Sequence, residues 1–360
     1  MEGSMFNIKF NQTENQFLHH ERFKDIAPRI ASELSYLQNH FFLFSSGTTS
    51  TDPKGYAVSE DALLANARAV NEFFELTSSD VWGLTLPWFH IGGLSVIARA
   101  HLLNAKLVDL TGKWDPHSWV KKLDEEGVTI TTVVPTQIFD IVQNNLKAPV
   151  QLKYIIVGGD FLSSELAKRA IDLGWPVIKT FGMTEVCSQL ASARSPSDQT
   201  LQILPIHQIR LDSDQRLWVK SQAMYTLEFV FKDNKVSTTK ASSRCDKDGF
   251  FPTNDLVQWN NNQLVHLGRI DDQIKINGRL TSVNTLKDQL YTYALKHNLY
   301  GEIELAIIDD PRTGKNIEVL YTTNDLDMGA LKSIYHPIRP EFRKVESFQR
   351  TDLGKLKKSL

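Results

Sequence analysis

The chain has 360 residues, 41% of them hydrophobic and 23% charged, which is the composition of a globular protein long enough for two domains. Its 40 basic and 42 acidic residues leave a formal net charge of -2, so charge gives no reason to expect binding to nucleic acid or to an anionic membrane. The first residues lack the pattern of a signal peptide, and no later stretch is apolar and long enough to cross a bilayer. We therefore expect a cytoplasmic protein. The cysteines, Cys187 and Cys245, lack metal-ligand spacing and are expected to be ordinary thiols.

Between residues 59 and 180, stretches with helical periodicity alternate with short apolar runs. Ser59 is a helix cap, Asp115 followed by Pro116 opens another helix, and Gly127 ends it. Only Asn66 breaks the apolar pattern of the first helix. The expected helices are 60–74, 93–103, 116–126, 137–145 and 163–173, and the expected strands are 81–86, 106–110, 128–134, 154–157 and 177–180. This alternation predicts an α/β fold with a parallel sheet and right-handed crossovers.

Ligands of such sheets bind beyond the carboxyl ends of the strands. The segments that directly follow an expected strand are 87–90, 135–137, 158–160 and 181–185. The rule therefore brings one set of residues to the ligand edge. They are His90, Thr136, Gly158, Gly159, Asp160, Phe181, Gly182, Thr184 and Glu185.

The pattern of apolar and polar residues changes after residue 200. Short alternating runs from 201 to 265 predict antiparallel β structure. Residues 267–278 are polar and charged, and they precede a smaller α+β segment. We place the domain boundary at Arg269, which gives a large domain over 1–268 and a small one over 269–360.

A loop rich in small hydroxyl residues follows the apolar run 41–44. Backbone N–H groups and hydroxyls in such a loop can approach phosphate oxygens, and Lys54 adds a point charge. The loop is not the GxxxxGK[ST] type, because Gly55 follows the lysine, and by itself it can also be an ordinary polar turn. Its candidate phosphate contacts are Ser45, Ser46, Gly47, Thr48, Thr49 and Lys54.

This loop resembles the signature loop of the acyl-adenylate-forming superfamily, which includes acyl-CoA synthetases, luciferases and adenylation domains of peptide synthetases. It departs from that pattern by Ser50 in place of glycine and by one extra residue before Pro53. The resemblance implies a large N-terminal adenylation domain and a small mobile C-terminal lid domain. Residues 1–44 form a shorter segment ahead of the loop than relatives carry, and we expect activity to survive this shortening.

Two further segments match the superfamily in the same order. Residues 181–185 are similar to its aromatic-Gly-x-Thr-Glu motif, and residues 253–255 to its Thr-Gly-Asp motif, with Asn254 replacing glycine. Taken alone, Glu185 would be a solvated charge at a helix start and 254–255 a turn. By the resemblance, nucleotide contacts come from Phe181 near adenine, Gly182, Thr184 at the α-phosphate, Glu185 through Mg²⁺, and Asp255 at the ribose hydroxyls.

Two motifs near the end of the chain complete the likeness. Residues 267–278 are similar to the hinge between the two domains, and 350–355 to the C-terminal Thr-x-x-Gly-Lys segment. The roles that the resemblance implies are ribose or phosphate contact for Arg269, the pivot for Asp271, a place at the thiol tunnel for Gly278, and transition-state charge balance for Lys355.

Segments 86–93, 134–138 and 152–159 resemble one branch, the o-succinylbenzoate–CoA ligases of menaquinone biosynthesis. This branch implies an aromatic carboxylic acid as substrate, with His90 in the acyl pocket, although a histidine between aromatic residues is also a common core residue. Arg194 is the candidate for a distal carboxylate. The other expected substrate contacts are Thr136, Ser188 and Gln189.

The resemblance implies a ligase that uses ATP, Mg²⁺ and coenzyme A. Three alternatives stay open: a ligase for another aryl or acyl acid, a stand-alone adenylation enzyme that loads a carrier protein, and a catalytically inactive adenylate-binding protein. The shorter N-terminal segment and the altered phosphate loop favour the last of these. The sequence leaves the oligomeric state undetermined.

Overall fold

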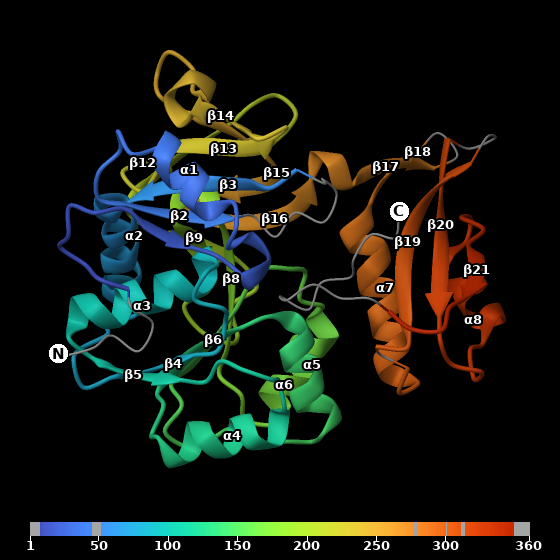
Figure 1. The fold of residues 1–360 in the computed structure, drawn as a ribbon. Coiled ribbons are helices and arrows are strands. Elements are labelled where there is room, and N and C mark those ends of the chain that lie inside the picture. Colours follow the sequence, from blue (N-terminus) through green and yellow to red (C-terminus); the bar gives the residue numbers. More distant parts are fainter. Residues whose placement is uncertain (1–7, 45–51, 277–278, 300, 311–313, 349–360) are drawn as a thin grey trace.

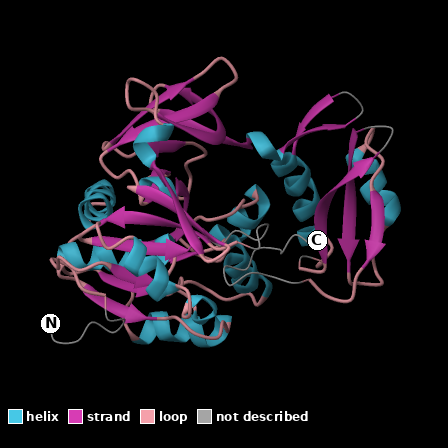
Figure 2. Cartoon of the chain, turned by 45° about the horizontal axis from the view of Figure 1, so that its top comes forward, coloured by secondary structure: helices cyan, strands magenta, loops and turns pink. Residues whose placement is uncertain are grey.

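The computed structural model describes residues 8–44, 52–276, 279–299, 301–310 and 314–348. It has a large domain and a smaller C-terminal domain that lies beside it (Figures 1 and 2). The large domain contains a long mixed sheet and a second, five-stranded sheet, and the small domain has a sheet of its own. The α/β fold expected from the sequence is confirmed.

Five parallel strands form one end of the long sheet. They are β4 (Val81–Leu84), β5 (Lys106–Asp109), β6 (Ile130–Val133), β7 (Tyr154–Val157) and β8 (Val177–Met183), in the order β5-β4-β6-β7-β8. The helices between them are α3 (Ile91–Leu103), α4 (Pro116–Glu125), α5 (Pro135–Gln143) and α6 (Ser164–Asp172). The strand order reverses between β4 and β6, and a crevice for ligands is expected at that point.

The helix caps expected from the sequence are present. Helix α2 (Glu60–Phe73) begins where the Ser59 hydroxyl accepts a hydrogen bond from the backbone of Ala62, at 3.2 Å. Asp115 caps α4 in the same way through the backbone N–H of Ser118, at 2.9 Å. Within the described residues, no helix has the length and apolar character that a membrane span requires.

The other end of the long sheet is antiparallel. Its strands are β9 (Ser188–Ser192), β10 (Leu201–Ile203), β11 (His207–Leu211), β12 (Arg216–Ser221), β15 (Phe251–Asn260) and β16 (Gln263–Arg269). The change of direction occurs at β8, which continues to Met183 instead of ending at Thr180 as expected. The reason is its partner: β9 folds back along β8 and pairs Thr180 with Ser192 and Met183 with Ser188.

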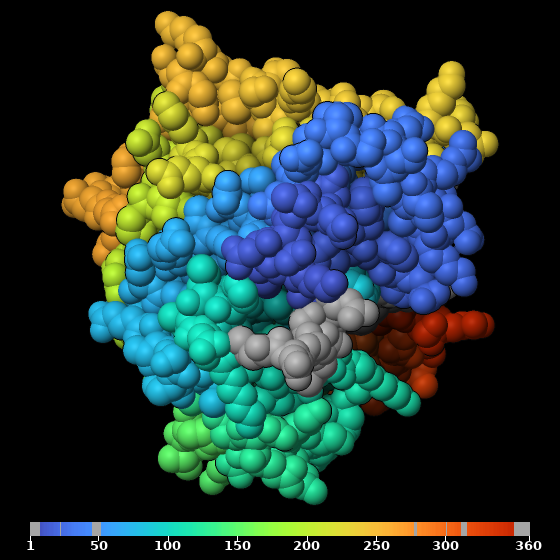
Figure 3. Space-filling model, turned by 60° about the vertical axis from the view of Figure 1, so that its left-hand side comes forward, coloured from blue at the N-terminus to red at the C-terminus, as the bar shows by residue number. Residues whose placement is uncertain are grey.

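The second sheet of the large domain joins the N-terminal segment to residues more than 150 positions later, and α1 (Ala27–Glu33) packs against it. Its strands, in sheet order, are β1 (Gln16–Leu18), β2 (His40–Phe44), β3 (Lys54–Ser59), β13 (Leu227–Lys232) and β14 (Lys235–Lys240). Phe42, Phe44 and Phe229 are among the buried residues of its core. In Figure 3 the N-terminal segments, in blue, lie at the centre and right of the view, and part of the small domain, in red, is visible behind them at the right edge.

The chain passes from the long sheet to the small domain at Arg269, the last residue of β16. A short 3-10 helix, η4 (Ile270–Asp272), separates it from the first strand of the small domain. The small domain consists of β17 (Gln273–Ile276), β18 (Arg279–Ser282), α7 (Val283–Lys296), β19 (Ile303–Asp310), β20 (Gly314–Tyr321), α8 (Met328–Tyr335) and β21 (Glu341–Lys344). Helix α7 faces the large domain, where Leu295 joins a core cluster of that domain and Asp288 accepts a hydrogen bond from the backbone of Ser164, at 3.4 Å.

Candidate active site

Glu185 lies where the chain reverses between β8 and β9, in the 3-10 helix η2 (Thr184–Val186). The reversal needs left-handed backbone at Cys187 (φ 58°) and Ser188 (φ 107°). It also needs glycine at position 182, because a Cβ there would lie 1.8 Å from the carbonyl oxygen of Ser188. Helix α2 supports this reversal through Asn66, a fully buried residue whose amide donates to the carbonyl oxygens at positions 186 and 189. The residue that broke the apolar pattern of α2 therefore helps to hold the site.

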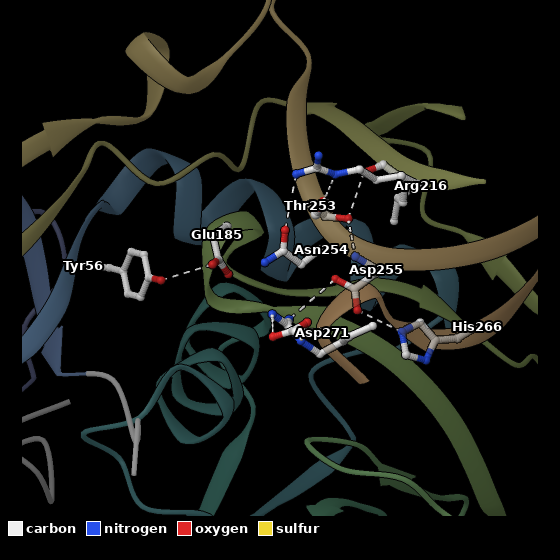
Figure 4. Close-up of polar contacts among 10 residues, drawn as sticks. Tyr56, Glu185, Arg216, Thr253, Asn254, Asp255, His266 and Asp271 are labelled. Carbon is white, nitrogen blue, oxygen red and sulfur yellow. Dashed lines mark hydrogen bonds and ion pairs between the residues drawn. The ribbon is translucent and has the colours of Figure 1, made fainter. Parts of the chain in front are cut away.

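Asp255 lies on β15, opposite Arg269 on β16. Its carboxylate is buried, at 5% exposure, and receives two positively polarised groups. His266 Nε2 lies 2.9 Å from Oδ1, and Arg269 Nη1 lies 4.0 Å from Oδ2. Arg269 also forms a two-pronged contact with Asp271, at 3.0 and 3.2 Å. Figure 4 shows Asp255 between His266 and Asp271, on the side of the site opposite Tyr56.

His266 connects the two halves of the site and was not singled out from the sequence. Its ring stacks on Phe181 with 4.4 Å between centroids, while its Nε2 contacts Asp255. One face of Phe181 is therefore covered, and an adenine ring would have to use the other face. The turn at 261–262 fixes the hairpin register that pairs His266 with Val257, two residues beyond Asp255. If the hairpin had been predicted from this turn, its register would have placed His266 on the strand next to Asp255.

The surroundings of Glu185 fit a magnesium ion held together with a nucleotide. The Tyr56 hydroxyl donates to Oε1 at 3.1 Å, and Oε2 accepts no hydrogen bond from any described residue. No group of three or more His, Cys, Asp or Glu side chains suited to a metal exists among the described residues. Mg²⁺ is typically bound by one or two protein carboxylates, and phosphate and water oxygens supply its other ligands. A single carboxylate with one oxygen available is therefore sufficient as the protein ligand.

Lys54, at the end of the expected phosphate loop, is the first residue of β3. Its Nζ lies 2.8 Å from Glu228 Oε2, and Arg244 Nη2 lies 3.1 Å from the other oxygen of the same carboxylate. The remaining loop contacts expected from the sequence, and two residues from the later motifs, lie outside the described residues. They are Ser45, Ser46, Gly47, Thr48, Thr49, Gly278 and Lys355.

The residues expected at the acid substrate lie around the reversal of strand order. His90 is the cap residue of α3, and Gly93 lets that helix start against the backbone, because a Cβ at 93 would lie 2.3 Å from the carbonyl oxygen of Pro87. Thr136 is the second residue of α5, directly after β6. Ser188 accepts a hydrogen bond from Ser95 of α3, at 3.2 Å. His90 and Thr136 thus follow β4 and β6 at the edge of the sheet that the ligand rule indicates, and Ser188 contacts the helix that begins beside His90.

Three other expected contacts directly follow β7, and a fourth lies on β9. Gly159 and Asp160 are exposed just beyond β7, with Gly159 in the left-handed region at φ 84°. Gly158 approaches β8 so closely that a Cβ would lie 2.8 Å from the side chain of Thr180. Gln189 is buried on β9 beside Gly182, and its Nε2 has no hydrogen-bond partner among the described residues.

Arg194 does not join this group. It is close to Glu185 in sequence, but the chain has returned along β9 by then, so Arg194 lies beside the amino end of β8. There its guanidinium stacks 4.0 Å from the ring of Phe73, and Nη1 donates to the backbone oxygen of Phe73 at 2.6 Å. The expectation that Arg194 binds a distal carboxylate is therefore corrected: its charge ties β9 to the end of α2.

Arg194→Ala is expected to lower the free energy of unfolding by about 1–2 kcal/mol, because it removes a charged hydrogen bond and a cation–π contact. The KM for the acid should stay unchanged. Chemical denaturation and steady-state kinetics measure the two effects, with Arg68→Ala, at an exposed position on α2, as the control. A raised KM with normal stability would return Arg194 to the substrate pocket.

A family model described as AMP-binding enzyme matches residues 8–210, more than half of the chain. The chain belongs to the AMP-binding enzyme family. The superfamily predicted from the motifs is thereby confirmed.

Relatives of this AMP-binding enzyme include two bacterial proteins named 2-succinylbenzoate–CoA ligase. The one from Staphylococcus epidermidis is 26% identical over 331 residues, which are 88% of this chain and 68% of the relative. The one from Enterococcus faecalis is 27% identical over 255 residues, which are 65% of this chain and 52% of the relative. The chain therefore spans only about half to two thirds of their length.

Two solved structures of adenylate-bound or ATP-bound proteins have a fold similar to that of this chain. The o-succinylbenzoate CoA synthetase of Bacillus subtilis, in complex with the acyl-adenylate intermediate OSB-AMP, has a TM-score of 0.73 at 21% identity, and the match covers 88% of this chain and 67% of that one. ATP-bound MatB from Rhodopseudomonas palustris has a TM-score of 0.71 at 19% identity, with 88% and 66% covered. At these identities the comparison concerns the fold of this AMP-binding enzyme.

Proposed function

We propose that this AMP-binding enzyme activates a carboxylic acid with ATP and Mg²⁺ and transfers the acyl group to the thiol of coenzyme A. A carboxylate oxygen attacks the α-phosphorus, the bond to pyrophosphate breaks, and an acyl-adenylate forms. The thiolate sulfur then attacks the acyl carbon and AMP leaves. One observation carries the proposal: His266 joins the motif that contains Phe181 and Glu185 to Asp255. Its ring stacks on Phe181, and its Nε2 contacts the carboxylate of Asp255.

The residues of this site have distinct roles in the proposal. Asp255, buried and oriented by His266, accepts hydrogen bonds from the ribose hydroxyls. Phe181 offers its uncovered face to adenine. Glu185 binds the magnesium ion, which balances phosphate charge when bound. Arg269, held by Asp271, contributes positive charge at the ribose or phosphate.

The acid that we propose is o-succinylbenzoate, which places the chain in menaquinone biosynthesis. Support comes from the names of its relatives at 26–27% identity and from the segments around His90 and Thr136. The buried amide of Gln189 offers an unused donor to an acceptor atom of the acid, and the Ser188 hydroxyl lies beside it in sequence. His90 lines the acyl side of the site in this proposal.

A pyrophosphate-release screen with MgATP over aromatic and aliphatic acids tests the proposal. We expect release only with added acid, and fastest with o-succinylbenzoate. Adding coenzyme A or a carrier-protein thiol to the best acid then identifies the acceptor. If no acid in the screen causes pyrophosphate release, the chain is not an active ligase, and the inactive adenylate-binding alternative is favoured.

Lys355→Ala is expected to abolish the first step and to leave the second. In the proposed mechanism Lys355 balances charge on the α-phosphorus during adenylation only, and the small domain then turns about Asp271, in the connection between the two sheets. Pyrophosphate release should fall by about 100-fold or more. Formation of acyl-CoA from supplied acyl-adenylate should continue, with Lys344→Ala, at an exposed lysine of the small domain, as the control. Equal loss of both steps would refute this division of labour.

A further inference from the structure

Tyr56 connects the end of the phosphate loop to the carboxylate of Glu185. It lies on β3, two residues after Lys54, and its hydroxyl donates to Glu185 Oε1 at 3.1 Å. Strand β3 is hydrogen-bonded on both sides, to β2 and to β13, so its backbone position is firmly set. Figure 4 shows the tyrosine pointing at the carboxylate from the opposite side to Asp255.

A second tyrosine fixes both ends of this hydrogen bond. The ring of Tyr225 packs edge-on against Tyr56, with 5.3 Å between centroids and 88° between planes. The backbone N–H of Tyr225 donates to the backbone oxygen of Glu185, at 3.0 Å. The hydroxyl of Tyr225 is buried and has no hydrogen-bond partner among the described residues. The two tyrosines share one environment, but only Tyr56 reaches the carboxylate with its hydroxyl.

Tyr56 acts as a hydrogen-bond donor in this contact. A phenol carries its proton at neutral pH, and a carboxylate can only accept, so the Tyr56 hydroxyl donates to Glu185 Oε1. Glu228 is itself balanced by Lys54 and Arg244, so its charge is neutralised locally. The hydroxyl hydrogen of Tyr56 is therefore available for the hydrogen bond to Glu185.

We propose that Tyr56 is a positioning residue for the metal-binding carboxylate. By holding Oε1 of Glu185, it orients Oε2 and the remaining lone pairs toward the magnesium ion that accompanies the nucleotide. Such outer partners of a metal ligand fix its geometry and commonly affect metal affinity. The inference rests on the proposed function, because it assumes that Glu185 binds the metal.

Calorimetric titration of the full chain with ATP, in the presence and absence of Mg²⁺, tests this role. Tyr56→Phe removes only the hydroxyl and is expected to reduce the Mg²⁺-dependent gain in ATP affinity by roughly tenfold, the size expected when a hydrogen bond to a charged group is lost. Its affinity for metal-free ATP should match that of the wild type. Tyr225→Phe, the matched control, should behave like the wild type in both titrations.

A double-mutant cycle with Glu185→Gln provides the second measurement. In the Glu185→Gln background, Tyr56→Phe should cause no further loss of Mg²⁺-dependent affinity, because the carboxylate to be oriented is gone. Additive losses, equal loss with and without Mg²⁺, or an unchanged Tyr56→Phe protein would each overturn the positioning role while leaving Glu185 as the metal ligand. If the wild type shows no Mg²⁺-dependent gain at all, the metal role of Glu185 fails first, and the role of Tyr56 with it.

Discussion

Glu185→Gln is expected to lower acid-dependent pyrophosphate release by about 100-fold at saturating ATP and Mg²⁺, since it removes one preorganised charge from the reacting phosphates. Glutamine has the shape of glutamate and can still accept the hydrogen bond from Tyr56 through its side-chain oxygen. The backbone contact with Tyr225 is also untouched. The fold should therefore persist, and the loss should appear in the chemical step.

The control for this variant is Glu165→Gln, which removes a half-buried carboxylate of α6 whose one ion pair among the described residues is with Arg169, at 3.0 Å. It should retain wild-type activity, because an ion pair between neighbouring turns of one helix contributes little. Pyrophosphate release measured over a range of Mg²⁺ concentrations distinguishes the two variants. Wild-type activity in Glu185→Gln would remove this residue from the metal site and leave the nucleotide to be bound without it.

The sequence was informative where structure is decided by near neighbours. Ser59 and Asp115 were recognised as caps because a hydroxyl or carboxylate before a helical pattern can satisfy the first free N–H groups. The alternation of helices and strands from 59 to 180 predicted the parallel sheet, since parallel strands need crossover connections. The ligand edge followed from strand direction alone.

It was less informative where distant segments meet. Arg194 lies nine residues after Glu185, but β9 carries it back toward the amino end of β8, and the sequence did not show that β8 would continue to Met183 and pair with its successor. His266 and Tyr56 could not be assigned to the site from the sequence, because their partners are distant in the chain. His266 contacts Phe181, 85 positions away, and Tyr56 contacts Glu185, 129 positions away. Asn66 was an anomaly in the sequence and is a support of the site in the structure.

Gly182→Ala is expected to damage stability and activity together, because the added Cβ would lie 1.8 Å from the carbonyl oxygen of Ser188 and 2.7 Å from its carbon. Neither backbone atom can move unless β8 and β9 separate. We expect a loss of about 3 kcal/mol in the free energy of unfolding, at the upper end of overpacking effects. Activity should fall by about 100-fold, because displacement of the site geometry by even about 1 Å has an effect of that order.

Denaturation and pyrophosphate release test both effects of Gly182→Ala. The control is Gly329→Ala, where the new Cβ would meet only a side-chain oxygen of Asp327 at 3.2 Å. A Gly182→Ala protein that is stable and active would mean that the chain reverses after β8 by a different backbone path, and the placement of Glu185 beside Tyr56 would have to be abandoned.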